Sequence, residues 1–127
     1  MERRRKLLIA DDDRQLCSML SDFFSKDYDI FCAFDGADAL MLAVEHRPDL
    51  VLLDITMPIL DGRTICKKLK GNPLTKDTCI IMVTGKSAQY DRLVGFEVGA
   101  DDYVEKPVSL EYLARIVEGL LRESGGD

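Results

Sequence analysis

Short, almost wholly apolar runs alternate along the chain with longer stretches in which apolar residues recur every three or four positions. The short runs are typical of strands covered on both faces, and the longer spacing is typical of amphipathic helices. The predicted strands are Lys6–Ala10, Asp29–Phe34, Leu50–Asp54, Cys79–Thr84 and Asp102–Glu105. The predicted helices are Arg14–Lys26, Ala37–His46, Gly62–Gly71, the more polar Ser87–Val98, and a last helix from an N-cap at Ser109 to about Arg122.

Five strands and five helices in strict alternation predict an α/β fold with one parallel sheet and right-handed crossovers. No internal repeat or interdomain linker interrupts this order. We therefore expect residues 1–127 to form one domain, with an ordered core over about 5–122. The polar, Gly-rich residues 123–127 are expected to be a tail or the start of a linker.

Composition narrows the class of protein. A chain of 127 residues that is 46% hydrophobic can bury a sufficient core without disulfides or a structural metal. Its net charge of −6 makes it a poor direct binder of nucleic acid. Four scattered cysteines and one histidine form no zinc pattern and suit a reducing compartment. Without a signal-peptide or membrane-spanning segment, we expect a cytoplasmic protein with no membrane association.

Polar residues mark the point where the predicted strands end. Asp11, Asp12 and Asp13 follow the first strand, and Asp54 ends the third. Thr84 ends the fourth strand and Lys106 follows the fifth. Because the carboxyl ends of parallel strands share one edge of a sheet, we expect these side chains to converge there.

This set of side chains suits phosphoryl transfer. Clustered carboxylates repel one another unless a cation is present, and an all-oxygen site open to water suits Mg²⁺. A hydroxyl and an ammonium group opposite the metal could hold the oxygens of a phosphoryl group. A carboxylate between them is a competent nucleophile, and its product would be an aspartyl phosphate.

Each residue alone also has an ordinary structural interpretation. The three aspartates could cap the first helix, and we expect Asp13 to do mainly that. Asp54 could be a turn residue, Thr84 a plain strand end and Lys106 a surface lysine. Their joint occurrence at four strand ends favours a functional site.

Five segments of the chain resemble the receiver domains of two-component response regulators. They are LLIADDD, RPDLVLLDITMPILDG, IIMVTG, GADDYVEKP and SLEYLARIVEGLL, and they span nearly the whole sequence. The resemblance implies a flavodoxin-like, doubly wound sheet of five parallel strands in the order 2-1-3-4-5 with five flanking helices. It also implies a signalling switch that takes a phosphoryl group from a sensor histidine kinase or a phosphotransfer protein. Such a domain is not an enzyme beyond its self-catalysed phosphorylation and autodephosphorylation.

The resemblance assigns a role to each matching residue of the site. Asp54 would be the phosphoacceptor and a metal ligand, together with Asp11, Asp12 and the backbone carbonyl of Thr56. Asp12 would bind Mg²⁺ directly and Asp11 through water, and Mn²⁺ could replace Mg²⁺. Lys106 would contact the phosphoryl group, and the Lys106–Pro107 peptide bond would be cis.

The resemblance also implies how a signal would leave the site. Thr84 would hydrogen-bond the phosphoryl oxygen, and Tyr103 would follow it from an exposed to a buried position. The face made by residues 87–98, the fifth strand and the last helix would change as a result. A half-buried tyrosine on an edge strand is the alternative interpretation of Tyr103.

A homodimer through that same face is a further hypothesis, with Asp101 of one copy paired to Arg115 of the other. One departure from the common family pattern lies near the acceptor. Ile59 stands where glycine is usual, which should stiffen the loop after Pro58.

Two other classes of protein share parts of this pattern. A phosphatase of the haloacid-dehalogenase type needs an Asp-x-Asp pair at the end of the first strand and carries its nucleophile there. Here the aspartates are contiguous, the isolated acceptor ends the third strand, and no cap domain is inserted. A flavin- or nucleotide-binding domain would need a Gly-rich phosphate loop where this chain has an acidic cluster. Both classes are disfavoured.

Overall fold

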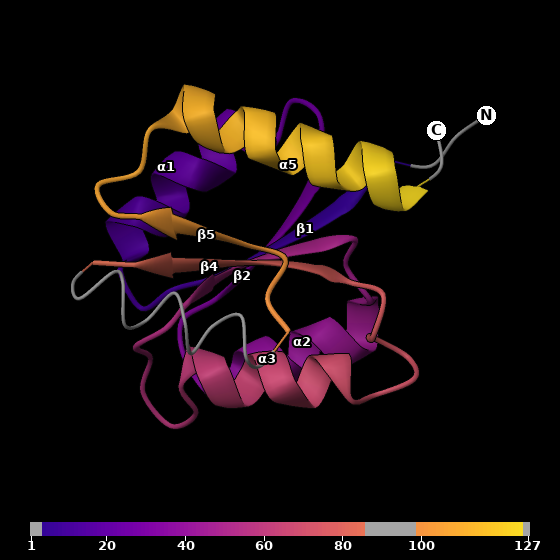
Figure 1. The fold of residues 1–127 in the computed structure, drawn as a ribbon. Coiled ribbons are helices and arrows are strands. Elements are labelled where there is room, and N and C mark those ends of the chain that lie inside the picture. The colour runs from indigo at the N-terminus through magenta and orange to yellow at the C-terminus, as the bar shows by residue number, and fades with distance from the viewer. Residues whose placement is uncertain (1–3, 86–98, 126–127) are drawn as a thin grey trace.

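The computed structural model of the chain describes residues 4–85 and 99–125, which form five strands and four helices (Figure 1). In chain order they are β1 (Lys6–Ala10), α1 (Arg14–Phe24), β2 (Asp29–Ala33), α2 (Gly36–His46), β3 (Leu50–Asp54), α3 (Gly62–Lys70), β4 (Cys79–Thr84), β5 (Asp102–Glu105) and α5 (Leu110–Gly125). Five flanking helices were predicted, and the described residues contain four, so the predicted number is not matched. The helix predicted over Ser87–Val98 lies outside the described residues.

All five strands form one parallel sheet in the order β2-β1-β3-β4-β5. This order confirms the predicted flavodoxin-like sheet. From β1 the chain first adds β2 on one side and then crosses to the other side of β1 to form β3. β1 and β3 are therefore parallel neighbours, with their carboxyl ends at the same edge of the sheet. Residues that follow these two strands are thus brought together, although more than forty positions separate them.

Helices cover both faces of the sheet: α1 and α5 lie on one face, and α2 and α3 on the other (Figure 1). Successive residues of the strands point to opposite faces, so each face has its own apolar core. The core under α1 and α5 includes Leu7, Ile9, Leu52, Ile81 and Val117, and the core under α2 and α3 includes Leu8, Val51, Leu53, Ile65 and Met82. Each such buried side chain contributes about 1.5–3 kcal/mol, which favours this single register of the sheet.

Helix α1 ends at Phe24, two residues before the predicted end at Lys26. The cause is a contact that the local pattern does not show. The guanidinium group of Arg4 donates to the carbonyl oxygens of Ser25, Lys26 and Tyr28 at 2.7–3.2 Å and pairs with Asp29. These bonds hold the chain in a turn where the helix would otherwise continue.

Helix α5, in contrast, is longer than predicted. Its N-cap is Ser109 as predicted, since the Tyr112 N–H donates to the Ser109 hydroxyl at 3.3 Å. The helix continues to Gly125, past the predicted end near Arg122. Arg122 and Glu123 are exposed and do not oppose a helix, so the helix includes residues 123–125. No helix in the described ranges is both long and apolar enough to cross a membrane.

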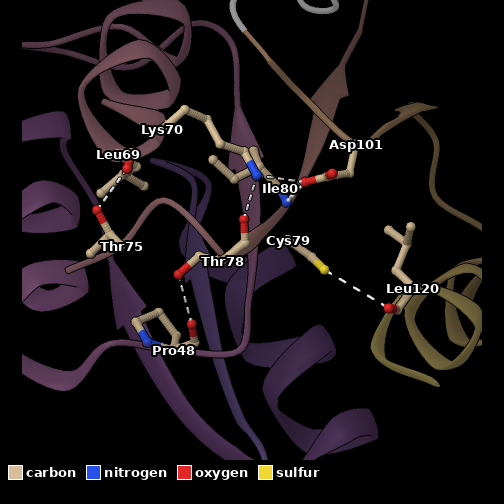
Figure 2. Close-up of polar contacts among 9 residues, drawn as sticks. All are labelled: Pro48, Leu69, Lys70, Thr75, Thr78, Cys79, Ile80, Asp101 and Leu120. Atoms are coloured by element: carbon tan, nitrogen blue, oxygen red, sulfur yellow. Dashed lines mark hydrogen bonds and ion pairs between the residues drawn. The ribbon is translucent and has the colours of Figure 1, made fainter. Parts of the chain in front are cut away.

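A set of polar contacts links the segments at the amino edge of the sheet, opposite the carboxyl ends of the strands (Figure 2). Lys70, the last residue of α3, donates to the Thr78 carbonyl at 2.7 Å and pairs with the Asp101 carboxylate at 3.0 Å. The same carboxylate oxygen accepts the Ile80 N–H at 2.8 Å. The residue before β5 is therefore bonded to both β4 and the end of α3.

Candidate metal and phosphoryl site

Three aspartates meet at the carboxyl edge of the sheet. Asp11 and Asp12 follow β1, and Asp54 ends the adjacent β3. One carboxylate oxygen from each lies within 4.8 Å of the other two. Asp11 and Asp54 are each 3% exposed, whereas Asp12 is exposed to solvent. The sheet therefore brings together two buried carboxylates and one that water can reach.

The neighbouring Asp13 has a different task. Its carboxylate accepts the N–H groups of Gln15 and Leu16, each at 3.1 Å, and so caps the amino end of α1. This confirms the predicted capping role. The Asp13 N–H donates to Asp11 at 2.9 Å, so the turn that begins α1 also fixes the Asp11 carboxylate.

Lys106 supplies the positive charge of the site from the loop after β5. Its ammonium group lies 3.1 Å from Asp11 and 3.9 Å from Asp54. Burial lowers the pKa of Lys106, but the hydrogen bond to Asp11 and the charge of Asp54 outweigh it and raise the pKa overall. The Lys106–Pro107 peptide bond is cis, and the Lys106 N–H donates to the Thr84 carbonyl.

Asp54 is electrostatically unfavourable in its charged form. Burial and the neighbouring Asp11 raise its pKa from 3.8 to about 6, against the opposing effects of Lys106 and of the Thr56 N–H. That N–H donates to the Asp54 carboxylate at 3.2 Å. Among the described residues, the Lys106 ammonium group alone thus does not balance the carboxylates gathered here, and the site favours a further cation.

The donor set fits Mg²⁺. It consists only of hard carboxylate oxygens, it is compact, and Asp12 leaves one side open to the water molecules that Mg²⁺ retains. Thr56, whose carbonyl is the remaining predicted ligand, is exposed and lies two residues beyond Asp54. No softer ligand lies in this cluster among the described residues, which disfavours zinc.

The two predicted switch residues lie on β4 and β5. Thr84 is buried at the carboxyl end of β4, one residue beyond Val83, which pairs with Asp54. Tyr103 pairs in register with Met82 and is 4% exposed, so it is buried, not half-buried. Both residues therefore belong to the part of the sheet that adjoins the acceptor strand.

Two glycines that shape the acceptor loop were not singled out from the sequence. A Cβ atom on Gly62 would collide with the carbonyl oxygen of Asp54, and one on Gly36 would collide with that of Leu60. Both glycines also donate backbone hydrogen bonds to this loop, to Ile55 and Pro58 respectively. The Asp-Gly pair at the start of α3 was the one available signal, and the contact of Gly36 depends on tertiary packing.

Comparisons with known proteins agree with this geometry. Residues 7–118 match the model of the response regulator receiver domain family. A protein described as a response regulator from Chloroflexus aurantiacus is 34% identical, with a TM-score of 0.88 over 94% of this chain and 98% of that one. A CheY-like receiver domain protein from Methanospirillum hungatei is 25% identical, with a TM-score of 0.91 over 98% of both chains.

The chemotaxis response regulator CheY4 of Vibrio cholerae is a further similar structure. It is 28% identical, with a TM-score of 0.86 over 93% of this chain and 99% of that one. The family match covers most of the chain and includes the acidic cluster, Thr84 and Lys106. The chain belongs to the response regulator receiver domain family of two-component signalling.

Proposed function

We propose that this domain is a phosphorylation-activated switch in which Asp54 accepts a phosphoryl group from the phosphohistidine of a sensor histidine kinase or phosphotransfer protein. The observation that carries the proposal is the meeting of one ammonium group and three carboxylates at a buried strand end. Asp54 is one of these carboxylates and lies 3.9 Å from the Lys106 ammonium group. A nucleophile, a cationic partner and a cation site are thus combined in one place.

The reaction would form a bond between an Asp54 carboxylate oxygen and phosphorus while the phosphorus–nitrogen bond of the donor breaks. The imidazole leaves with the electron pair of that bond. Lys106 would leave its present pairing to hold one phosphoryl oxygen, and the Thr84 hydroxyl would hold another. Bound Mg²⁺, held by Asp11, Asp12, Asp54 and the Thr56 carbonyl, would offset the remaining negative charge; Mn²⁺ could take its place.

Water would later cleave the acyl phosphate and release inorganic phosphate, so the domain resets itself without turning over a separate substrate. We further propose that Thr84 and Tyr103 pass the change to the face made by β5 and α5, together with the helix predicted over residues 87–98, which lies outside the described residues. That face would control an output or a partner. We place the domain, spanning residues 1–127, in the cytoplasm, without direct contact to nucleic acid or membrane.

A homodimer through that face also remains a proposal. The pairing first suggested for it, between Asp101 and Arg115 of two copies, must compete with contacts inside one chain. The Asp101 carboxylate already bonds Lys70 and the Ile80 N–H, as Figure 2 shows. Light scattering of the beryllofluoride-treated protein tests the dimer, and a sample that stays monomeric would refute it.

Thermal melting with Mg²⁺ and beryllofluoride tests the switch without any partner protein. Beryllofluoride bound to a carboxylate imitates an acyl phosphate, so Mg²⁺ and beryllofluoride together should raise the Tm more than the sum of their separate effects. Asp54→Asn is the matched control and should lose the joint effect. Equal responses of the two proteins would contradict the proposed function.

A further inference from the structure

Ile59, in the loop between β3 and α3, combines two unfavourable features. Its backbone is left-handed, with φ = 75°, which is rare for a β-branched residue. The Leu60 N–H donates to the Pro58 carbonyl at 2.9 Å, which makes Ile59 the centre of a γ-turn of the rare, strained kind. Its side chain is 75% exposed, so packing does not offset that strain.

The loop cannot relax this conformation, because its neighbours hold it on both sides. The Pro58 carbonyl also accepts the Gly36 N–H at 3.0 Å, which ties the turn to the start of α2. On the other side, Asp61 caps α3 by accepting the Thr64 N–H at 2.9 Å. The backbone at position 59 is therefore imposed, and a glycine there would adopt it without strain.

A single exposed apolar side chain needs no explanation by itself. Ile59 does need an explanation, because a large β-branched side chain stands where the backbone conformation disfavours it and where it does not pack in the core. Strain that the surrounding structure maintains points to a function at that place. The side chain of Ile59 must therefore be useful to something outside this fold.

The position of the loop indicates which kind of molecule would contact the Ile59 side chain. Ile59 lies five residues after Asp54, and the loop that carries it begins at the strand end where Asp54 lies. Asp54 is 3% exposed, so a donor protein must bring its phosphorylated imidazole down to the site. Its surface then covers the exposed residues of this loop, among them Thr56 and Ile59. A small phosphodonor does not cover the loop and can reach Asp54 without contacting the exposed Ile59 side chain.

We infer that Ile59 is a specificity-determining contact for the protein phosphodonor, and that its side chain packs on an apolar surface beside the donor's phosphohistidine. This inference rests on the proposed function of Asp54. Strain in the free domain is offset when the side chain leaves water in the complex. Donors with a polar surface at that point are disfavoured, because they leave Ile59 exposed or bury it against polar groups.

Transfer rates from two kinds of donor test the inference. The protein donor is the isolated, phosphorylated histidine domain of a sensor kinase, selected from a panel because it phosphorylates the unaltered chain; acetyl phosphate is the small donor. Ile59→Ala and Ile59→Asn should lower kcat/KM with the protein donor about tenfold, the loss expected for one buried contact. Both variants should react with acetyl phosphate at an unchanged rate.

Two further variants separate the contact from a general loss of structure. Ile59→Leu keeps an apolar side chain and should restore transfer from the protein donor. Leu74→Ala is the matched control, since Leu74 is also large and 49% exposed but lies in the connection before β4, at the opposite edge of the sheet. It should transfer normally.

Two results would overturn the inference: normal protein transfer by Ile59→Ala and Ile59→Asn, or equal losses with both donors. Failure of the unaltered chain to react with either donor would instead refute the proposed function of Asp54. The two failures are therefore distinguishable.

Discussion

Asp54 is held in a place that disfavours its own charge. Burial and Asp11 raise its pKa to about 6, from 3.8 for an unperturbed aspartate. The folded state therefore binds a proton more tightly than the unfolded state does. As the pH rises from about 4 to about 6, this difference lowers the free energy of unfolding, and the loss persists at higher pH.

Asp54→Asn should accordingly stabilise the protein in the absence of divalent cations. We expect a gain of about 1–3 kcal/mol near neutral pH, since each pKa unit corresponds to about 1.4 kcal/mol. The gain should shrink as the pH falls through about 6 towards 4, where the native carboxylate is protonated as well. Urea unfolding at several pH values, with EDTA present, measures it.

Asp22→Asn is the matched control for this prediction, because Asp22 is an exposed aspartate on α1, remote from the acidic cluster. It should leave stability nearly unchanged at every pH. A destabilised Asp54→Asn protein at neutral pH would show that Lys106 balances the carboxylates without help.

At the scale of single residues, the sequence located those that end apolar strands. Asp54, Thr84 and Lys106 stand out because a buried strand stops at a polar side chain. Residues that depend on contacts between distant segments could not be located in this way. The dimer hypothesis pairs Asp101 with Arg115 of a second copy, and no local pattern indicates that Asp101 also pairs with Lys70 of the same chain. The end of α3 and the start of β5 are far apart in the sequence and are brought together only by the folded sheet.

Among the elements, the turn from β1 into α1 divides its three aspartates between two tasks. Asp13 caps the helix, while Asp11 and Asp12 face the cation site. Asp13→Ala should lower the free energy of unfolding by about 1 kcal/mol and leave Mg²⁺ affinity nearly unchanged. Asp12→Ala should weaken Mg²⁺ binding without destabilising the fold.

Calorimetric titration with Mg²⁺ and urea unfolding of both variants check this division. The neighbouring variants serve as controls for each other. Equal losses of Mg²⁺ affinity in Asp12→Ala and Asp13→Ala would mean that Mg²⁺ responds to the total negative charge of the turn and not to Asp12 in particular.

The connection between α3, β4 and β5 is a second feature at this scale. Asp101→Ala removes the ion pair to Lys70 and leaves the Ile80 N–H without its acceptor. We expect a loss of about 1–3 kcal/mol, the usual cost of an unsatisfied buried donor. Asp101→Asn keeps an oxygen for that N–H and should lose less than half as much. Urea unfolding of both variants measures the difference in the free energy of unfolding. Equal losses would mean that the charge of Asp101, and not its hydrogen bond to Ile80, stabilises the fold.

The bounds of the elements were predicted closely where the pattern is local. Three bounds, the end of β2, the start of α2 and the end of α3, differ by one residue. The larger differences have causes outside the pattern. Arg4 ends α1 early through contacts from the chain before β1, and α5 runs on through exposed polar residues that no apolar spacing marks.

At the scale of the whole molecule, the two edges of the sheet have different characters. The amino edge is closed by hydrogen bonds such as that from the Thr78 hydroxyl to the Pro48 carbonyl, at 3.0 Å (Figure 2). The carboxyl edge instead holds the Asp54 carboxylate, whose charge is only partly balanced, and a strained turn at Ile59. The amino edge is thus held by hydrogen bonds between neighbouring segments, and the carboxyl edge carries the charged groups of the proposed chemistry.

The overall fold could be predicted because alternation of short apolar runs with helical spacing leaves few arrangements. A parallel sheet with right-handed crossovers needs helices on both faces, and both cores follow from that. The charge balance of the site could not be predicted in the same way. It depends on distances such as the 3.1 Å from Lys106 to Asp11, which exist only in the folded molecule.

Phosphorylation with radiolabelled acetyl phosphate, comparing the unaltered protein with Asp54→Asn in the presence and absence of Mg²⁺, tests the central claim most directly. We expect acid-stable, base-labile label on the unaltered protein with Mg²⁺, and almost none with EDTA or on the Asn variant. The Asn side chain fits the same space but cannot form an acyl phosphate. Label retained by Asp54→Asn at the level of the unaltered protein would contradict the assignment of Asp54 as the phosphoacceptor.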